Sequence, residues 1–539
     1  MKNVLCKIVT FRLPIIIEST PSLTMLLIDP GSSRCEINEP IGISSLHSYT
    51  QQFLPHEIKT DLLFFPLSSY TNAHQLAQYD VVGISTKIGS LEKVHKIVSD
   101  VQTIPSGKQP IVVLGDLLAT FATDQMLDLF PNAVMVRGEG EDALVGIVES
   151  IIEWKKGTHL LTDMLLENNV TNIAFNNHNS RNYTNRKNIN LENSPLVDRS
   201  FASSVAMHGG IIRAEASRGC SYGRCSFCAI QYKYSTVAVW RPVPLDRIIE
   251  ELRVLSHLGI KNPYYTDEDF FGNDPMRAYR LAEAIIVDKQ RGNIDPEMSL
   301  YIDLRTNSIL SPGHTNVLSG KDILSKLYEA GLREVFVGIE SGTLTQLKRF
   351  RKPGIINTSI KALGILNDLG IHIDIGFIMF DPKITLTELL SNIQFIKDHN
   401  LNTHDARLTK SLRIEPGTPI LNEYMKSGLI SGKLDVDNLT YPYTWIHSDA
   451  EAAFMIFSHW EQQHINYTYR LQALTRGEII SEQERLKLKK HLGEIRSIEI
   501  DVLEKIVTSF LNGTSVNESD FNKDTDKIIT ILNSQFINN

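Results

Sequence analysis

The sequence contains little cysteine: five residues in a chain of 539. So few thiols in so long a chain argue against a disulfide framework and for reduced cysteines, some of them metal-bound. No apolar run approaches the roughly 20 residues that a membrane helix needs. Lys7 and Arg12 interrupt the apolar N-terminal stretch, and no small-residue cleavage site follows, so we expect no secretion signal. These absences favour a cytoplasmic protein.

Neither sign of charge dominates the chain. The net charge is −8, with 22% charged and 42% hydrophobic residues, a composition typical of a globular protein without a nucleic-acid surface. The length exceeds one ordinary core and predicts two or three domains. We expect a Rossmann-like domain over 1–155, a linker over 156–205, a partial barrel over 206–430 and a helical region over 431–539.

The N-terminal domain alternates between two kinds of segment. Short runs of Val, Ile and Leu at 24–29, 81–86, 111–116 and 133–138 predict buried parallel strands, and stretches with helical spacing lie between them. This order predicts a doubly wound α/β domain whose ligand sits outside the carboxyl ends of the strands. The linker is rich in Asn, and we expect one small hairpin in it.

A second alternation fills the predicted barrel. Strand-like segments occur at 211–217, 264–269, 299–307, 334–341, 372–380 and 406–416, with helical patterns between them. Six βα units predict a partial TIM-like barrel, whose functional groups cluster at the carboxyl ends of the strands. Residues from 445 onward are polar with helical spacing, as in "EQERLKLKKHLGEI".

Three of the five cysteines follow the first barrel strand, in "SRGCSYGRCSFCAI" at 217–230. A structural zinc site needs four ligands, but only Cys220, Cys225 and Cys228 are here, and His208 lies twelve residues before the first of them. Three thiolates suit a 4Fe–4S cluster and leave one iron free to chelate S-adenosylmethionine (SAM). Zinc and plain buried thiols are the alternatives.

At these cysteines the chain resembles the radical SAM superfamily, and the resemblance covers residues 205–425. It implies that a 4Fe–4S cluster passes an electron to bound SAM and yields a 5′-deoxyadenosyl radical. The usual spacing has three residues between the first two cysteines, whereas four intervene here. Gly223 lies among them, and glycine tolerates the backbone angles that a longer loop requires.

The resemblance also implies SAM contacts at the strand ends. Carboxylates can hold the ribose hydroxyls or the methionine ammonium, and arginine can pair with the methionine carboxylate. Taken singly, each of these residues could equally be a solvated loop residue, and the basic run at 347–353 is predicted to be a solvated face. The residues implied are Phe227, Asp267, Glu268, Arg305, Glu340, Ser341 and Ile414.

The first domain resembles the cobalamin-binding domain that precedes the barrel in one large radical SAM class. The crevice at its strand ends would be lined by Ser85, Thr86, Gly115, Gly138 and Glu139. No G-x-G-x-x-G follows the first strand, which disfavours a dinucleotide. No Asp-x-His-x-x-Gly supplies an axial histidine either, so we expect cobalamin without one. A flavodoxin-like domain with another ligand, or with none, is the alternative.

Cysteine counting limits the reaction. No cysteine follows Cys228, which disfavours an auxiliary cluster or a thiol hydrogen donor there, and Cys6 and Cys35 cannot supply a second three-cysteine cluster. The leading prediction is a cobalamin-dependent methyltransferase acting on an unactivated centre of a small molecule or peptide, with a donor such as flavodoxin or ferredoxin. The alternatives are a cobalamin-independent radical rearrangement or cyclisation, and a degenerate binding protein. Neither a membrane nor a nucleic acid is an expected partner.

Overall fold

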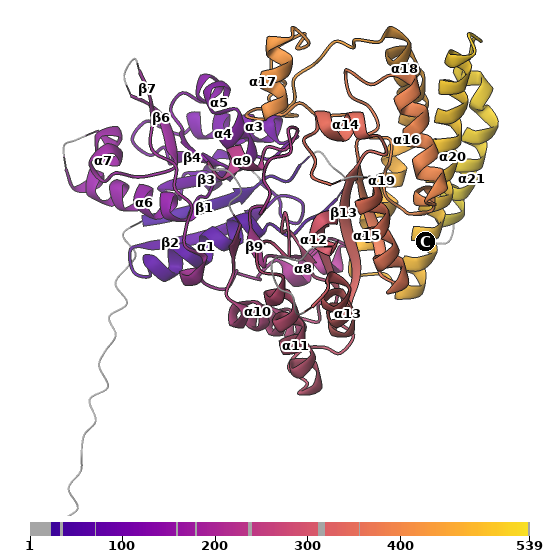
Figure 1. Cartoon of the computed structure of the whole chain (residues 1–539). Coiled ribbons are helices and arrows are strands. Elements are labelled where there is room, and N and C mark those ends of the chain that lie inside the picture. The colour runs from indigo at the N-terminus through magenta and orange to yellow at the C-terminus, as the bar shows by residue number, and fades with distance from the viewer. Residues whose placement is uncertain are drawn as a thin grey trace, which may run out of the picture.

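The computed structural model describes residues 23–32, 36–70, 72–157, 160–177, 180–235, 240–310, 318–354 and 356–536. Figure 1 shows the N-terminal domain at one end of the molecule, the barrel in the middle and the C-terminal helices at the opposite end. The described helices include none that is both long and apolar enough to cross a membrane.

The N-terminal domain is built on a seven-stranded sheet of order β2-β1-β3-β4-β5-β6-β7. The first five strands in this order are parallel, and β6 is antiparallel to both of its neighbours, β5 and β7. Alternate side chains of β1 enter separate hydrophobic cores on the two faces of the sheet, so the domain is doubly wound, as predicted. The strands are β1 (Leu23–Asp29), β2 (Ile58–Phe64), β3 (Val81–Ser85), β4 (Ile111–Gly115), β5 (Val134–Val136), β6 (Ile173–Asn177) and β7 (Ser180–Tyr183).

Helices cover both faces of this sheet. One face carries α1 (Ile41–Phe53) and α6 (Glu141–Lys156), and the other carries α3 (Leu91–Gln102), α4 (Asp116–Phe121) and α5 (Thr123–Leu129). Two shorter helices are α2 (Ala73–Leu76) and α7 (Leu161–Glu167).

The segment predicted as a linker contains the expected hairpin, β6–β7. The hairpin does not stand apart, because β6 pairs with β5 and extends the first sheet. Ile173, Ala174 and Phe175 are buried and supply the apolar side chains that hold it there. The linker also holds η1 (Leu191–Asn193) and α8 (Ala202–Met207). The exact domain boundaries stay a prediction.

The second domain is a partial barrel with a five-stranded parallel sheet of order β8-β11-β12-β13-β14. The strands are β8 (Arg213–Ala214), β11 (Tyr264–Tyr265), β12 (Leu300–Arg305), β13 (Leu332–Glu340) and β14 (His372–Phe377). The longer helices between them are α10 (Leu245–His257), α11 (Pro275–Gln290), α13 (Gly320–Ala330), α15 (Ile356–Asp368) and α16 (Leu386–Asp398). A two-stranded ribbon, β9 (Ser217–Arg218) with β10 (Arg241–Pro242), and the short helices α9 (Ile230–Lys233), α12 (Thr306–Leu310) and α14 (Leu344–Arg349) complete it.

The prediction of a sixth regular strand at 406–416 is wrong. Residues 406–416 make only a bridge from Ser411 to Phe380, supported by a bond from the Leu412 N–H to the Phe380 carbonyl at 2.7 Å. The chain turns away at Asp381, whose carbonyl accepts the Ile384 N–H, so too little extended backbone remains beside it for a ladder. The segment nevertheless occupies the sixth position, next to the extension of β14.

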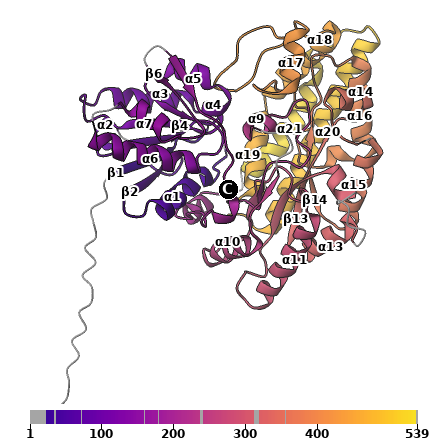
Figure 2. The same cartoon turned by 60° about the vertical axis from the view of Figure 1, so that its left-hand side comes forward.

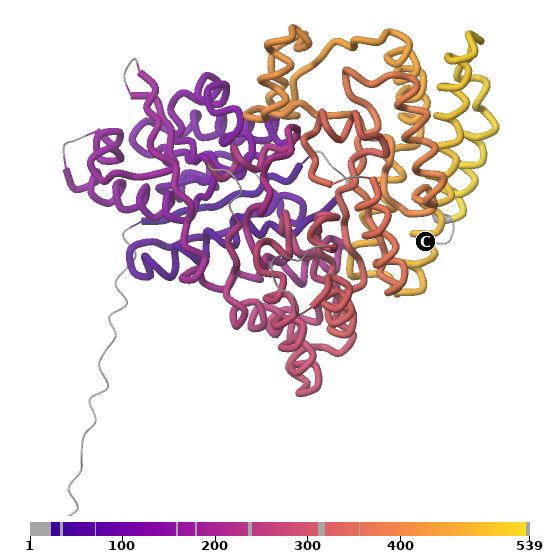
Figure 3. The backbone as a smooth tube through the Cα atoms, in the orientation of Figure 1, coloured from indigo at the N-terminus to yellow at the C-terminus, as the bar shows by residue number. Residues whose placement is uncertain are grey.

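The C-terminal region is helical, as predicted, and closes the open side of the partial barrel (Figures 1 and 2). From it, Arg476 pairs with Asp374 of β14 and Lys489 pairs with Glu334 of β13. Figure 3 traces the backbone from the first domain through the barrel to these helices. They are α17 (Pro419–Lys426), α18 (Ser448–Gln462), α19 (Ile465–Arg476), α20 (Glu482–Leu511) and α21 (Asn522–Phe536), with the short turns η2 (Leu401–Thr403) and η3 (Glu518–Phe521).

Candidate active site

The three clustered cysteines lie in a loop after β9 that depends on two glycines. Gly219 has a φ of +90° and Gly223 a φ of +56°, angles that glycine adopts readily. The backbone N–H groups of Tyr222 and Gly223 are hydrogen-bonded to the Cys220 sulfur. The extra residue between Cys220 and Cys225 is therefore accommodated by a left-handed glycine, at the position that the sequence suggested.

The far end of this loop is held by the barrel and by α17. The Ser226 N–H donates to the Phe350 carbonyl at 2.8 Å and its hydroxyl donates to the Arg349 carbonyl at 2.7 Å. The Ile420 N–H donates to the Ser226 carbonyl at 2.9 Å. The ring of Phe227 packs edge-on against Phe350, with centroids 5.4 Å apart. The loop is thus fixed at both ends before any ligand binds.

The electrostatics of the thiols suit a cationic ligand. Burial raises the pKa of Cys220, raises that of Cys225 to about 11 and raises that of Cys228 to about 12, and neighbouring thiolates in the loop add to the last two shifts. Buried thiols near one another become thiolates when a metal takes the place of the protons. Within the described residues, no three His, Cys, Asp or Glu side chains converge on one metal ion. A cluster binds each cysteine to a different iron, so its donor set fits this loop.

The segment after β11 is hydrogen-bonded to the cysteine loop and to the residues just before it. Asp267 accepts the Ala216 N–H at 2.9 Å and the Ser217 hydroxyl, Glu268 accepts the Gly219 N–H at 2.8 Å, and Asp269 accepts the Ser221 hydroxyl at 2.7 Å. Asp267 is fully buried, and this burial raises its pKa well above the usual value. Both its oxygens are used inside the protein, so the geometry gives it a positioning role. Its SAM contact, and that of Glu268, stay predictions.

Arg305 connects the same elements from the end of β12. Its Nε donates to Asp269 at 2.8 Å and another guanidinium nitrogen donates to the Ser221 hydroxyl at 2.5 Å. Its positive charge lowers the pKa of Cys220 and Cys225 against the larger effect of burial. Arg305 therefore faces the cysteine loop, as expected of a residue at this strand end.

Glu340 carries an unusual backbone angle at the end of β13. Its φ is +70°, in a region that non-glycine residues rarely adopt, and the pairing with β14 shifts register at this point. Strained residues cluster at functional sites. Its carboxylate pairs with Lys352 at 3.0 Å, and a Cβ at Gly338 would come within 2.5 Å of that carboxylate. Gly338 therefore leaves room for the pair.

Lys352 was missed by the sequence, because residues 347–353 were expected to be a solvated face. That prediction is correct for Lys348 and Arg351 but wrong for Arg349 and Lys352. The Lys352 N–H bonds back to the Leu347 carbonyl at 3.0 Å, past Arg351 with φ +48°, in the manner of a helix C-terminal cap. This cap turns the Lys352 side chain toward Glu340 and Cys225, which both raise its pKa against burial.

Ser341 and Ile414 are both buried. The Ser341 hydroxyl donates to Asn392 at 3.0 Å, and the Ile414 carbonyl accepts the Tyr441 N–H at 2.9 Å. The Ile414 side chain packs in a small apolar cluster with Phe350. These contacts explain their burial, and their contact with SAM stays a prediction.

A cavity of about 260 Å³ lies at the carboxyl ends of β1, β3, β4 and β5. Ser85, Gly115, Gly138 and Glu139 line it, as predicted. Thr86 does not, because strand alternation turns its side chain inward. The Thr86 hydroxyl donates to the Gly115 carbonyl at 2.5 Å and accepts the Ala119 N–H at 3.1 Å.

The lining of this cavity fits a corrin ring. Apolar side chains form most of its walls, including Leu27, Ile43, Val113 and Val136. Gly42 on α1 adds open space, since a Cβ there would meet nothing within 4 Å. The described side chains around the cavity include no histidine. Apolar walls with few polar groups are typical of cofactor sites.

The barrel closes the other side of this cavity, through Glu215, Arg218, Lys233 and Tyr234. Arg218, two residues before Cys220, pairs with Glu139 at 3.0 Å, with Glu141 at 2.8 Å and with Glu215 at 2.8 Å. Burial raises the pKa of Glu139, but Arg218 and Arg241 more than offset it and hold the pKa below the usual value. The cavity rim and the cysteine loop therefore share one ion network.

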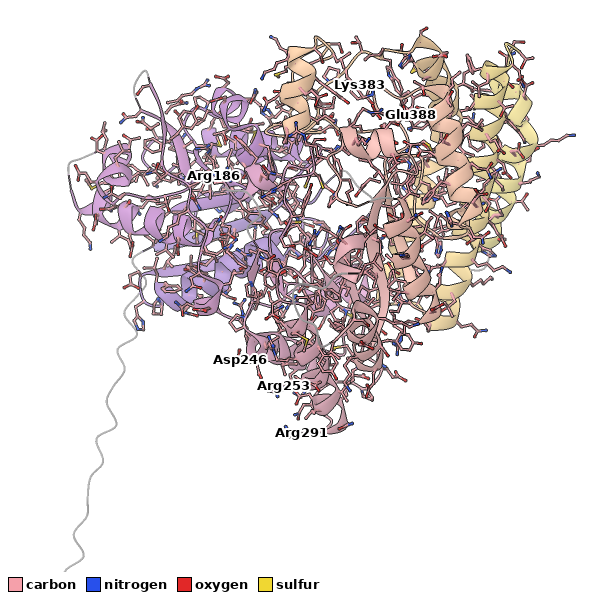
Figure 4. The ribbon with its side chains drawn as sticks, viewed as in Figure 1. Arg186, Asp246, Arg253, Arg291, Lys383 and Glu388 are labelled. Atoms are coloured by element: carbon pink, nitrogen blue, oxygen red, sulfur yellow. The ribbon has the colours of Figure 1, made fainter. Side chains whose placement is uncertain are left out.

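Helix α9 joins the two domains at the same place. Arg186 of the first domain donates to the Tyr232 carbonyl at 2.6 Å and lies over the Tyr232 ring. Phe121 stacks on that ring with centroids 5.4 Å apart. Figure 4 shows Arg186 on the side of the first domain, Lys383 and Glu388 near α14, and Asp246, Arg253 and Arg291 at the far lower edge of the barrel.

Polar side chains fill the barrel interior below the cysteine loop. Asp303 of β12 accepts the Tyr264 hydroxyl at 3.3 Å, and Asp374 of β14 pairs with Arg476. Burial, together with the nearby charge of Asp374, raises the pKa of Asp303 to about 7. Its ionised form is therefore disfavoured in the folded protein.

We expect Asp303→Asn to change how stability depends on pH. A carboxyl whose pKa is raised by folding stabilises the fold at low pH, and this contribution is lost as the pH rises toward 7. Between about pH 5.5 and pH 8, the wild type should lose about 2 kcal/mol more than the variant, at about 1.4 kcal/mol per pKa unit. Urea unfolding at both pH values measures this. Parallel pH profiles for the two proteins would contradict it.

Residues 215–396 match the family model described as the Radical SAM superfamily. The chain therefore contains a radical SAM domain, which agrees with the cysteine loop and the strand-end residues. Radical SAM enzymes as a class need a substrate and a reductant.

Among curated proteins, the chain is 28% identical over 341 residues to 4′-phospho-dehydrooxetanocin synthase of Priestia megaterium, covering 60% of this chain and 43% of that protein. The match thus spans less than half the length of that relative.

Two solved structures share the whole arrangement of domains. OxsB, a cobalamin-dependent SAM radical enzyme solved with aqua-cobalamin, superposes with a TM-score of 0.77 at 20% identity, covering 95% of this chain and 80% of that one. TsrM, a radical SAM methyltransferase from Kitasatospora setae solved with cobalamin and a [4Fe-4S] cluster, gives 0.63 at 15% identity, covering 92% and 100%. At these identities the likeness shows the fold: a Rossmann-like domain, a partial barrel and a helical region.

Proposed function

We propose that this protein is a radical SAM enzyme that binds a 4Fe–4S cluster, SAM and cobalamin, and that it acts as a cobalamin-dependent methyltransferase on an unactivated centre of a small molecule or peptide. The observation that carries the proposal is the shared cavity: Arg218, Lys233 and Tyr234 of the barrel line the crevice of the first domain, directly beside the cysteine loop.

Each part of the site has a task in this proposal. When bound, the cluster supplies the electron that cleaves SAM, and cobalamin supplies the carrier of the methyl group. Cys220, Cys225 and Cys228 hold the cluster, while Glu340 and Arg305 orient SAM above it. Because Arg218 lines the cavity two residues before Cys220, the two proposed cofactor sites are adjacent, and such proximity replaces a bimolecular encounter with a positioned one.

Two other functions compete with this one. The relative from Priestia megaterium is named a synthase and not a methyltransferase, which favours a radical rearrangement or cyclisation with cobalamin accessory or absent. A degenerate binding protein is the remaining alternative. The intact cysteine loop and its supporting carboxylates weigh against it.

Product analysis separates these functions. The protein is purified without oxygen, loaded with iron, sulfide and cobalamin, and given SAM and a strong reductant. Reductive cleavage forms 5′-deoxyadenosine, and methyl transfer from SAM forms S-adenosylhomocysteine. We expect both products, the second only with cobalamin. 5′-Deoxyadenosine alone, unchanged by cobalamin, would favour the rearrangement, and neither product would favour the binding protein.

Glu340→Ala tests the assignment of the SAM site. We expect SAM affinity to fall about tenfold or more, since a hydrogen bond to a charged group contributes about 1.5–3 kcal/mol, while iron content is retained. Equilibrium dialysis with labelled SAM measures the affinity. The control is Glu329→Ala, which removes another lysine-paired carboxylate. Glu329 is exposed on α13, where it pairs with Lys326 at 2.9 Å. Equal SAM affinity in the two variants would contradict the assignment of Glu340 to the SAM site.

The partners and location follow the same proposal. The substrate is a small molecule or peptide, the electron donor is a small redox protein such as flavodoxin or ferredoxin, and the reaction takes place in the cytoplasm. Reduction of the cluster by purified flavodoxin, followed by optical spectroscopy, tests the donor.

A further inference from the structure

Lys410 stands at the sixth position of the partial barrel. Its carbonyl accepts the N–H groups of Met379 at 2.9 Å and Phe380 at 3.2 Å, just beyond β14. The next residue, Ser411, forms the bridge to Phe380. The backbone at this position is therefore fixed against the sheet.

The Lys410 side chain extends on the side opposite to Thr409, whose hydroxyl donates to Glu461 of α18 at 2.6 Å. It is exposed to solvent, yet the surrounding protein desolvates it and lowers its pKa, an effect that Asp374 opposes and Arg407 and Arg476 reinforce. Glu340 acts on it as well. These neighbours come from β13, β14, α19 and the segment of Lys410 itself, which together surround the barrel interior.

Every carboxylate near Lys410 already has its own cation. Asp374 pairs with Arg476 and Glu340 pairs with Lys352 at 3.0 Å. Arg407 in turn pairs with Glu461 at 2.7 Å. Within the part of the chain that the structure describes, Lys410 itself has neither a hydrogen bond nor an ion pair from its side chain. The positive charge of Lys410 therefore has no partner of its own among the described residues.

A second cation adds to this excess. The guanidinium of Arg213 bonds to the amide oxygen of Asn38, with Nε at 3.0 Å, and lies over the ring of Tyr264. Arg213 forms no ion pair with a carboxylate among the described residues. Two further acids, Glu36 and Asp303, act on Arg213 through their charge, and Asp303, with its pKa raised to about 7, is only partly ionised at neutral pH. Lys410 and Arg213 are therefore two cations of this region that form no ion pair with a carboxylate among the described residues.

We propose that Lys410 binds an anionic group of the substrate, a carboxylate or a phosphate, inside the barrel. The inference rests on the proposed function, in which the substrate lies beside SAM. Lys410 is placed for this between Glu340, next to the cysteine loop, and Arg476 on the far wall. A partly desolvated ammonium is costly without a partner, and an anionic ligand supplies one through charge-assisted hydrogen bonds. Lys410 would thus set both affinity and orientation.

Chemical labelling of the wild-type protein tests this without a variant. Pyridoxal 5′-phosphate forms an imine with lysine that cyanoborohydride fixes, and pyridoxal is the same aldehyde without the phosphate. Pyridoxal closes to an internal hemiacetal and labels every lysine less, so the ratio of labelling by the two aldehydes is referred to Lys361, an exposed lysine on α15. Peptide mapping should find this ratio about tenfold higher at Lys410 than at Lys361, and inorganic pyrophosphate should protect Lys410. An equal ratio at the two lysines, or no label on Lys410, would overturn the proposal.

Anion binding at equilibrium gives a second test. Pyrophosphate at fixed ionic strength should raise the thermal midpoint of the holoenzyme by about 2 °C through binding to the native state. The rise should persist in Lys410→Arg and in Lys361→Gln, an exposed lysine on α15, and should be lost in Lys410→Gln. A full rise in Lys410→Gln would overturn the proposal. Neither test measures SAM cleavage, so a failed methyltransferase assay leaves them informative, and their failure leaves the proposed function standing.

Discussion

Cys228→Ser should lose its cluster and, with it, all measurable cleavage of SAM. Reconstitution of the wild type without oxygen should give about four irons and four sulfides per chain, as the cluster type requires. Burial raises the pKa of the Cys228 thiol to about 12. A serine hydroxyl is a weaker acid than a thiol, so a serine at this position offers no comparable anionic ligand. Removing a residue that only hydrogen-bonds to a metal ligand lowers metal affinity or activity about 10- to 100-fold. Removing the ligand itself should lower them more.

Iron and sulfide analysis with 5′-deoxyadenosine formation measures this result. The matched control is Cys35→Ser, which removes a thiol that the sequence places outside the cluster motif and that lies outside the described residues. It should retain iron and activity. A stoichiometric zinc content without iron uptake in the wild type, or a full iron content in Cys228→Ser, would contradict the cluster assignment.

Gly42→Phe should weaken cobalamin binding strongly while leaving the fold and the cluster intact. Gly42 lies on α1 at the edge of the cavity, and a Cβ there meets nothing within 4 Å. Because Gly42 lines the cavity of about 260 Å³, we expect a benzyl group at this position to occupy part of the space that the corrin needs. Glycine is a poor helix former, so the change does not weaken α1 itself. A rigid corrin cannot share this space, and we expect affinity to fall by at least about tenfold.

Corrin retained after gel filtration, read from its visible spectrum, measures the effect. The control is Gly364→Phe on α15, an exposed helical glycine whose Cβ would also meet nothing within 4 Å. It should bind cobalamin as the wild type does. Electron paramagnetic resonance of the cobalt(II) form adds a check on the axial site, where nitrogen splitting from a protein histidine would contradict the histidine-free lining. Equal cobalamin retention in both variants would place the corrin elsewhere.

Local patterns predicted much of the fold. Buried strands such as β1, β3 and β4 can be recognised in the sequence as nearly continuous apolar runs rich in Val, Ile and Leu, because both faces of a parallel sheet are covered. β2 was missed, since Lys59 and Asp61 interrupt its apolar pattern near the sheet edge. The hairpin β6–β7 was expected as a free element, and only its pairing with β5 shows that it belongs to the sheet.

The sequence by itself determined the cysteine loop and the residues at the strand ends. Cys220, Cys225 and Cys228 are near neighbours in the chain, so chain connectivity alone brings them together, and Gly223 supplies the backbone freedom that the spacing requires. Parallel strands bring their carboxyl ends to one edge, so Arg305 and Glu340 could be placed from strand order alone.

Only the tertiary structure decided which charges remain unpaired. Lys352 reaches Glu340 because a helix cap turns it inward, and Arg476 reaches Asp374 across 102 positions of sequence. Lys410 is distinguished by the partners that its neighbours have already taken. Ion pairing depends on distance in space, and long flexible side chains carry no periodic signal of their direction. The charge of the barrel interior therefore emerges only when the helices close around it.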